Sequence, residues 1–522
     1  MRRRDVLAAL LGAPLALACD DEETPPDVRG ELLGQSHQIG HLLRDGDVGR
    51  AFATGEVETR RVRVAVIGAG PAGLSAAWQL ARRGVEGVEL FELEPQPGGT
   101  SASGQSEVTA YPWGAHYLPV PSEAQPELRA LLREMDALDE DGEPQEHLLV
   151  RAPDERVFYR GYWYRGLYPT VGASAHDLAQ RDRFERIVER WLSFRDARGR
   201  RAFALPTRLG SDDAEVLALD RISAAEWCRR HGFTSRRLLW WLEYGTRDDY
   251  GLTLADASAW SLLFYHCARA EEGMDSADFL TWPAGNGALV RHLAEGRTVH
   301  TGHLAARVGR DGTVDLIEAS TRRPLRVQAE RVICAVPRFV ASRLVEGAPS
   351  AEDGHWGAWM VANLHLADRP GERGFPPAWD NVIYESPSLG YVTATHQRGR
   401  DFGPTVWTYY FPLVDSDPRD ARRRLLDHGW SAWTDAITAD LSRAHPDLRQ
   451  QLRRVDVWRW GHAMAQPRVG VRASEARRAA AAPVGQVHFA HSDLSGLALF
   501  EEAFDHGLRA ANEVADALTE AT

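Results

Sequence analysis

A glycine-rich turn near the start of the chain carries the residues best suited to chemistry. Its residues are Gly68, Ala69, Gly70, Pro71, Ala72 and Gly73, and they stand between an apolar strand pattern over 62–67 and a helical pattern over 74–83. In such a strand, turn and helix unit the first glycine provides the turn dihedrals, the second lets a pyrophosphate approach the backbone, and the third lets the helix pack on the strand. Phosphate charge then lies at the helix N-terminus. The turn therefore predicts a dinucleotide site.

An acidic residue follows at the distance that such a site requires. A second strand pattern over 88–91 ends at Glu92, which lies 19 positions after Gly73. A carboxylate at this point can accept hydrogen bonds from ribose hydroxyls. Glu94 is the alternative candidate for this role. The complete order of strand, turn, helix, strand and acid favours a ligand site over a tight loop with a purely structural role.

The next glycine pair distinguishes between cofactors. Glu92, five further residues and then Gly98, Gly99 and Thr100 resemble the E-x5-G-G-R segment of the flavin amine oxidase, protoporphyrinogen oxidase and phytoene desaturase superfamily. In this superfamily the second glycine pair meets the diphosphate of FAD, so the resemblance implies FAD as the cofactor. Thr100 stands where the superfamily usually has arginine, which implies that one phosphate contact differs in this chain.

Further segments resemble the same superfamily in the same order. Residues 111–117 resemble the segment beside the isoalloxazine, 282–289 and 332–337 resemble two internal motifs, and 487–511 resembles the closing motif. The strand over 303–308 is expected to bring its backbone to the adenine. By this resemblance the cofactor contacts outside the first βαβ unit are Trp113, Gly114, Ala115, Ala305, Asp493, Phe500 and Glu501.

The resemblance also implies the fold. It predicts an α/β protein of two-domain amine oxidase architecture, in which a discontinuous Rossmann-like FAD-binding domain carries an inserted α+β substrate domain. The FAD-binding domain is expected over 61–120, 280–345 and 480–522, and the substrate domain over 121–279 and 346–479. The inserted stretches are rich in tryptophan, tyrosine and arginine, and some of these aromatic side chains are expected to line the substrate pocket.

The N-terminus predicts an export signal. Residues 1–19 hold a run of arginines, a short apolar stretch and small residues before Cys19, and this pattern resembles a twin-arginine signal with a lipoprotein box. The resemblance implies a periplasmic or cell-envelope lipoprotein that is anchored to a membrane by lipid on Cys19. A chance apolar helix is the alternative. Residues 20–60 are then expected to form a tether, acidic and proline-containing at its start, and an N-terminal extension.

Composition argues against several partner classes. The formal net charge of -13 disfavours nucleic acid as a partner. The chain has no lysine, so its basic residues are all arginine and no Schiff base can form. The four cysteines are far apart and no metal-ligand spacing occurs, so no metal is expected. No second glycine-rich turn follows a strand, so oxygen or a membrane electron carrier, rather than a nicotinamide, is expected to reoxidise the flavin.

The sequence leaves the small-molecule substrate open. The resemblance implies hydride transfer from a substrate C–H bond to flavin N5. Amine oxidases of the superfamily add a water held by lysine and an aromatic cage, whereas this chain has no lysine and places Leu499 or Phe500 at the cage. Three hypotheses remain open. They are oxidation of an amine; desaturation, dehydrogenation or isomerisation of a hydrophobic compound; and a flavin-binding lipoprotein without catalytic activity.

Four side chains are candidates for assisting catalysis. His116 and Tyr117 lie beside the expected flavin edge, and Trp460 and His462 belong to a second aromatic segment. A histidine with a pKa near neutrality could take a proton from a substrate ammonium or hydroxyl group. A hydrogen-bonded structural histidine is the alternative for both histidines. The polar run over 247–251 is interpreted as an ion-paired turn rather than a catalytic pair.

Overall fold

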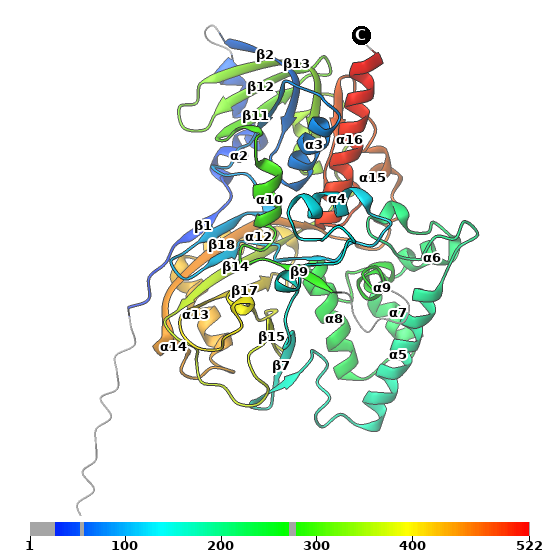
Figure 1. Cartoon of the computed structure of the whole chain (residues 1–522), viewed down its shortest axis with the longest axis vertical. Helices are drawn as coiled ribbons and strands as arrows, with labels where there is room; N and C mark the ends of the chain where they lie inside the picture. Colours follow the sequence, from blue (N-terminus) through cyan, green and yellow to red (C-terminus); the bar gives the residue numbers. More distant parts are fainter. Residues whose placement is uncertain (1–26, 53–56, 271–277, 521–522) are drawn as a thin grey trace, which may run out of the picture.

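The structure is a computed structural model that describes residues 27–52, 57–270 and 278–520. The predicted signal over 1–19, including Cys19, lies outside the described residues, and so does the acidic start of the predicted tether. Figure 1 shows three parts: a sheet with its helices at the top, a second and larger sheet at the lower left, and a layer of helices at the lower right.

The upper sheet has seven strands and is built from three separate stretches of the chain. Its order is β10-β3-β2-β13-β12-β11, and β19 also pairs with β13. The strands are β2 (Glu58–Ile67), β3 (Val88–Phe91), β10 (Thr298–His300), β11 (His303–Val308), β12 (Thr313–Glu318), β13 (Pro324–Cys334) and β19 (Val487–Phe489). β2 is parallel to β3 and β13, and residues 64–67 are buried, as is typical of a central parallel strand. β2 begins at Glu58 rather than at residue 62 because its exposed start still pairs with β13.

Glycine residues let two helices and the glycine-rich turn pack closely against one another. α3 (Pro71–Arg82) follows the glycine-rich turn, and α16 (Phe500–Glu520) packs along it, as Figure 1 shows. A Cβ atom at Gly507 of α16 would overlap the carbonyl oxygen of Ala72, and one at Gly73 would overlap that of Gly68. The missing side chains at these two positions therefore set how closely the turn, α3 and α16 can approach.

The lower sheet has eight strands in the order β1-β18-β14-β17-β16-β15-β7-β8. The strands are β1 (Leu32–Gly34), β7 (Glu155–Tyr159), β8 (Tyr162–Arg165), β14 (Trp356–Leu366), β15 (Asp380–Ile383), β16 (Tyr391–Thr393), β17 (Thr405–Pro412) and β18 (Leu452–Ala465). Three helices cover one face of this sheet. They are α12 (Pro418–Asp427), α13 (Trp430–Leu441) and α14 (Leu448–Gln451).

The two faces of β14 belong to different clusters of buried side chains. Met360 and Leu364 pack with Trp433 of α13, whereas Trp359 and Val361 belong to a cluster on the opposite face. This alternation follows from the two-residue period of a strand. The face of the sheet turned away from α13 is consequently aromatic and available to form the wall of a pocket.

The helical layer consists of α5 (Ala175–Ser193), α6 (Ala214–Ala218), α7 (Ala224–Arg230), α8 (Arg236–Tyr250) and α9 (Ala259–Cys267). α8 begins after Ser235, whose side chain accepts the backbone N–H of Leu238 at 3.3 Å. It ends at Gly251, which adopts the left-handed conformation with a φ of 59°. The last turn of α8 contains two consecutive carboxylates, Asp248 and Asp249.

Part of the predicted N-terminal extension is folded against both sheets. β1 pairs in parallel with β18, and α2 (His37–Asp45) packs through Ile39 and Leu42 on buried residues of β11. Between them, Ser36 donates hydrogen bonds from its backbone N–H and its hydroxyl group to the carboxylate of Glu94, each at 2.8 Å. These elements are too short for hydrophobic periodicity to reveal them in the sequence.

The remaining elements are shorter connections. They are β4 (Ser103–Gln105), β5 (Ala110–Pro112), β6 (Tyr117–Pro119), β9 (Phe279–Thr281), α4 (Pro126–Glu134), α10 (Gly287–Ala294), α11 (Arg338–Leu344) and α15 (Glu475–Ala479). Across the described ranges, no helix is long and apolar enough to cross a membrane. In the same ranges, no group of three or more histidine, cysteine, aspartate or glutamate residues is arranged to hold a metal ion.

The packing of α16 on α3 generates a stability prediction. We expect Gly507→Ala to destabilise the protein by about 1–3 kcal/mol, because the added methyl group must push α16 away from the backbone of Ala72. Thermal unfolding of the purified protein measures this effect. Gly429→Ala is the matched control, since no atom lies within 4 Å of a Cβ at that position. An unfolding temperature of Gly507→Ala equal to that of the control would contradict this account of the packing.

Candidate cofactor and substrate site

A long groove crosses the ends of β2, β3 and β13, where the glycine-rich turn lies. Most residues predicted to bind the cofactor line this groove. They are Gly68, Gly70, Pro71, Ala72, Glu92, Gly99, Thr100, Ala115, Ala305, Asp493 and Phe500. Parallel strands place their carboxyl ends at one edge of the sheet, so residues from distant segments meet there. The groove is one site assembled from segments that are separate in the sequence.

The glycine-rich turn leaves both space and hydrogen-bond donors for a diphosphate. Gly70 is the N-cap of α3 and has no side chain, so no side chain caps the first turn and its backbone N–H groups are available to an anion. A Cβ atom at Gly99 would lie 3.5 Å from the Cα atom of Gly70, between the two loops. Gly68 has a φ of 97°. These residues fit the diphosphate of a dinucleotide cofactor.

Glu92 is held in place at the ribose end of the groove by the backbone. Its carboxylate accepts the N–H of Ala69 at 2.7 Å and the N–H of Glu94 at 2.9 Å. Burial raises the pKa of Glu92, and these hydrogen bonds oppose the increase. Glu94, the alternative candidate, also lines the groove, but its carboxylate is bound to Ser36. Glu92 is therefore the better placed acceptor for ribose hydroxyl groups.

Four predicted cofactor residues, Ala69, Gly73, Gly98 and Trp113, lie behind the groove rather than in its wall. Ala69 supports Glu92, and its carbonyl group accepts the N–H of Gly98 at 2.9 Å. Gly73 allows α3 to pack on the turn. Trp113 is buried, and its carbonyl group accepts the indole N–H of Trp460 at 2.7 Å. These four residues therefore do not line the groove, but they shape it through backbone contacts and packing.

Asp493 comes from the C-terminal part of the chain and also lies in the groove wall. Its carboxylate accepts the N–H of Arg338 at 3.0 Å and the indole N–H of Trp356 at 2.9 Å, and it lies 3.1 Å from the ring of His491. Burial raises the pKa of Asp493, but His491 and these donors outweigh it and hold the pKa below its ordinary value. Asp493 therefore carries a negative charge in the groove at neutral pH.

A second cavity adjoins the groove and shares part of its wall. The shared residues are Thr100, Ala115, Ala463, Ala498, Leu499 and Phe500. Gly114 and Glu501, which were predicted to touch the cofactor, line this second cavity instead of the groove. Trp359, Tyr410 and Trp460 of the eight-stranded sheet provide aromatic walls. We call this space the substrate cavity.

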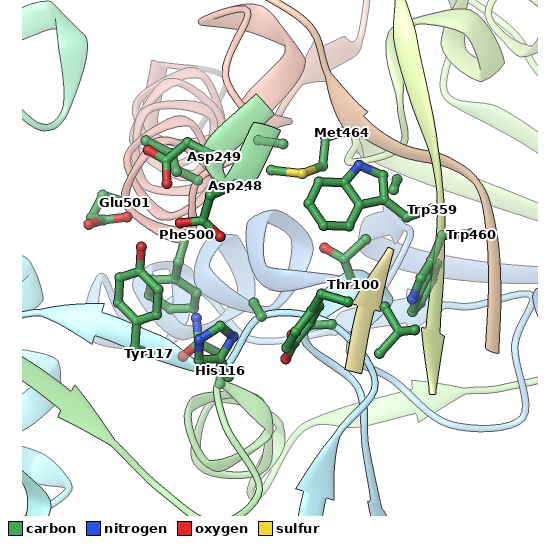
Figure 2. Close-up of a pocket in the computed structure, with 18 of the residues that line it drawn as sticks. Thr100, His116, Tyr117, Asp248, Asp249, Trp359, Trp460, Met464, Phe500 and Glu501 are labelled. Atoms are coloured by element: carbon green, nitrogen blue, oxygen red, sulfur yellow. The ribbon is translucent and has the colours of Figure 1, made fainter. Parts of the chain in front are cut away.

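Three carboxyl groups and one guanidinium group face the substrate cavity. Figure 2 shows Asp248, Asp249 and Glu501 on one side and the indole of Trp359 on the other. Asp249 forms an ion pair with Arg269, with 2.9 Å between Nη2 and Oδ2. Burial raises the pKa of Glu501, whereas Arg269 opposes the increase. The positive charge of Arg269 thus stabilises the charged forms of both Asp249 and Glu501.

Asp248 differs from its neighbours because no described residue forms a hydrogen bond or an ion pair with its carboxylate. The surface that the protein leaves uncovered on Asp248 faces the substrate cavity. Burial, followed by the negative charges of Asp249 and Asp380, raises the pKa of Asp248 well above its ordinary value. The sequence interpretation of 247–251 as an ion-paired turn describes Asp249 but missed Asp248. Two carboxylates at the negative end of a helix dipole were the signal that could have identified it.

More polar atoms of residues in the cavity wall have no protein partner. Nε1 of Trp359, Oδ1 of Asn286 and Oε1 of Glu501 are buried and form no hydrogen bond with any described residue. Buried polar groups without a partner are costly, and in native structures they point to a bound molecule or water.

The four catalytic candidates occupy different places. His116, Tyr117 and Trp460 line the substrate cavity, and the indole N–H of Trp460 is already donated to Trp113. His462 lines the cofactor groove instead and stacks on Phe339, with 4.3 Å between ring centroids. Burial lowers the pKa of His116 to about 3, and it lowers that of His462 to about 3 as well. Both rings are therefore neutral at physiological pH and are poor proton acceptors.

The fold and the two adjoining cavities define a flavin-dependent oxidoreductase. The model of the family of flavin containing amine oxidoreductases matches residues 71–515. The chain therefore belongs to this family, and FAD is its cofactor. This finding confirms the predicted superfamily, enzyme class and cofactor.

Solved structures confirm the predicted α/β fold with two domains. Wild-type putrescine oxidase bound to putrescine has a TM-score of 0.62 and 17% identity, and the match covers 88% of this chain and 100% of that chain. Cyclohexylamine oxidase from Brevibacterium oxydans IH-35A has a TM-score of 0.62 and 16% identity, with 88% of this chain and 99% of that chain covered. At these identities the likeness shows the fold alone.

Curated relatives match over short segments. The beta subunit of the NADP(+)-dependent formate dehydrogenase of Moorella thermoacetica is 35% identical over 125 residues, which is 20% of this chain and 18% of that protein. A methylenetetrahydrofolate--tRNA-(uracil-5-)-methyltransferase of Desulforamulus reducens is 68% identical over 34 residues, which is 6% of this chain and 8% of that protein. The chain thus spans less than a fifth of either relative.

The position of Glu92 generates a prediction about cofactor affinity. We expect Glu92→Ala to weaken FAD binding by about 10- to 100-fold, because a hydrogen bond to a charged group contributes roughly 1.5–3 kcal/mol. Fluorescence titration of the apoprotein with FAD measures the Kd. Glu89→Ala is the control, since Glu89 lies on the same strand but pairs with Arg60 and His300. A Kd within twofold of the wild-type value for Glu92→Ala would refute the assigned role.

Proposed function

We propose that this protein oxidises an amine by transfer of a hydride from the carbon beside the nitrogen to FAD. The observation that carries the proposal is the carboxylate of Asp248, which has no partner and faces the cavity that adjoins the cofactor groove. A substrate ammonium or amine group satisfies such a carboxylate both as a cation and as a hydrogen-bond donor.

The electrostatics around Asp248 favour a cationic occupant. The cavity wall contains the carboxyl groups of Asp248, Asp249 and Glu501 but only one guanidinium group among the described residues, that of Arg269, which forms an ion pair with Asp249. Asp248 also lies in the last turn of α8, where the helix dipole adds negative potential. A buried carboxylate without a counter-charge is strongly disfavoured, so the site gains stability when a cation enters.

The raised pKa of Asp248 favours transfer of a proton from the substrate ammonium group to its carboxylate. Loss of hydride from carbon needs the nitrogen lone pair, which forms the C=N bond, so the amine must first give up its ammonium proton. A carboxylate whose pKa lies well above the ordinary value takes this proton more readily than a normal aspartate does. The neutral ring of His116, with a pKa near 3, is a much weaker base. Asp248 is therefore the better candidate for the general base.

The other wall residues position the substrate and exclude water. Trp359, Tyr410 and Phe500 enclose the space with aromatic side chains. When bound, FAD supplies the acceptor for the hydride. The superfamily resemblance implies a water held by a lysine, whereas this chain has no lysine. In this cavity, Asp248 instead provides an unpaired polar group among the aromatic wall residues.

Dehydrogenation of a hydrophobic compound is the second candidate. It is favoured by the apolar part of the same wall, which includes Val361, Ala463, Met464 and Leu499. An uncharged substrate leaves Asp248 without a partner, so this candidate explains fewer features of the cavity. Oxygen or a membrane electron carrier remains the proposed acceptor for both reactions.

Substitution of Asp248 tests the proposal. We expect Asp248→Asn to slow flavin reduction by a good amine substrate by about 100-fold or more, which is the typical contribution of a general base. Anaerobic stopped-flow spectroscopy measures the rate. Glu243→Gln is the matched control, since Glu243 lies on the same helix and accepts the N–H of Leu254. Wild-type reduction rates in Asp248→Asn with every reactive amine would rule out this role for Asp248.

A further inference from the structure

The chain that precedes β2 crosses from one sheet to the other at the cofactor groove. β1 pairs in parallel with β18 of the eight-stranded sheet, and α2 packs beside β11 of the seven-stranded sheet, as Figure 1 shows. Gln35 and Ser36 connect β1 to α2. Of the described residues before β2, only Gln35 lines the groove. We call residues 32–45, which comprise β1, this connection and α2, the N-terminal clasp.

Both ends of the clasp are fixed to the body of the protein. Leu33 is the direct partner of Trp458 in the pair of β1 with β18. At the other end, Ile39 of α2 packs in a cluster of apolar side chains with Leu93 and Leu304. Leu93 and Leu304 also line the cofactor groove, so α2 packs on two residues of the groove wall.

Ser36 fastens the middle of the clasp to a carboxylate of the groove. Its backbone N–H donates to Oε1 of Glu94 and its hydroxyl group donates to Oε2, each at 2.8 Å. Ser36 is also the N-cap of α2, where a serine hydroxyl usually accepts a backbone N–H of the helix, but its side chain makes no such bond. The hydroxyl group is used for Glu94 instead. Two hydrogen bonds therefore join the clasp to the groove wall at the residue next to Gln35.

The groove holds an anionic cofactor without a guanidinium or ammonium group in its wall. None of the described residues that line it is an arginine, and the chain has no lysine. Three carboxylates, those of Glu92, Glu94 and Asp493, line the same groove. Binding of the FAD diphosphate therefore depends on backbone N–H groups such as those at the start of α3. Contacts to the rest of the cofactor consequently gain importance for its retention.

The side-chain amide of Gln35 is free to make such a contact. Gln35 is exposed, and no described residue forms a hydrogen bond with its side chain. An amide offers two N–H donors and one acceptor, which suit the hydroxyl groups of a ribose and the nitrogen edge of an adenine. The neighbouring Ser36 is bound to Glu94, whose own N–H donates to Glu92. Gln35 therefore lies near the carboxylate that is assigned to the ribose.

We propose that the N-terminal clasp closes the adenosine end of the FAD site. The amide of Gln35 contacts the adenosine, and the hydrogen bonds between Ser36 and Glu94 keep the clasp closed. The clasp and the cofactor stabilise each other, because a coupling between two binding events acts in both directions. Bound FAD thus orders residues 32–45, and the closed clasp slows the release of FAD.

Binding of FAD and of ADP to the apoprotein tests the contact of Gln35. ADP carries the adenosine and the diphosphate of FAD without the flavin. We expect Gln35→Ala to raise the Kd of both ligands by the same factor, about three- to tenfold, as fits the loss of one hydrogen bond. Gln38→Ala is the matched control, because Gln38 is exposed on α2 and does not line the groove. A change below twofold in Gln35→Ala, a loss confined to FAD, or an equal loss in the control would overturn this contact.

Release of FAD from the loaded protein tests the contact between Ser36 and Glu94. We expect Ser36→Ala and Glu94→Gln each to release FAD about tenfold faster after dilution, as measured by the rise in flavin fluorescence. The double variant should release FAD no faster than the faster single variant, because both changes weaken the same contact. Wild-type release rates in the single variants, or additive effects in the double variant, would contradict this role of the contact.

Hydrogen–deuterium exchange tests the coupling between the clasp and the cofactor. The amides of residues 37–45 should exchange faster in the apoprotein and in FAD-loaded Ser36→Ala than in the FAD-loaded wild type. Exchange over 37–45 that does not depend on FAD would overturn the proposal. None of these measurements uses an amine, so their outcome is independent of the proposed amine oxidation.

Discussion

The last turn of α8 places two carboxylates where the helix dipole is already negative and where protein, rather than water, surrounds them. Only one of them, Asp249, has a fixed cation, because Arg269 lies beside it. The other, Asp248, must either keep a proton or meet a cation that comes from outside. The substrate side of the molecule is arranged around this constraint, since Asp248 lines the same cavity as the aromatic side chains Trp359, Tyr410 and Trp460 of the eight-stranded sheet.

The cofactor side depends on the backbone far more than on side chains. The uncapped first turn of α3, the facing glycines Gly70 and Gly99, and the two backbone N–H groups that hold Glu92 form most of the groove. Close packing of α16 on α3 then brings Leu499 and Phe500 between the groove and the substrate cavity. The same helix therefore fixes the distance between the cofactor and the charged wall that carries Glu501.

The sequence predicted the parts of the site that depend on local order. The strand, turn and helix around Gly70 and the acid at Glu92 are separated by short, regular spacings, and hydrophobic periodicity identifies the elements. Asp248 was missed because helical periodicity does not reveal which turn faces a cavity. The export signal and Cys19 stay predictions, since they lie outside the described residues.

We propose that the cavity beside FAD takes an amine because Asp248 needs a cationic partner. Anaerobic spectroscopy of the FAD-loaded protein, mixed with alkyl amines and with uncharged alcohols and alkenes of matching size, distinguishes the two kinds of substrate. We expect the amines to bleach the visible flavin bands in a saturable manner and the uncharged compounds to leave them unchanged. Bleaching by an uncharged compound, with no response to any amine, would contradict this role of Asp248.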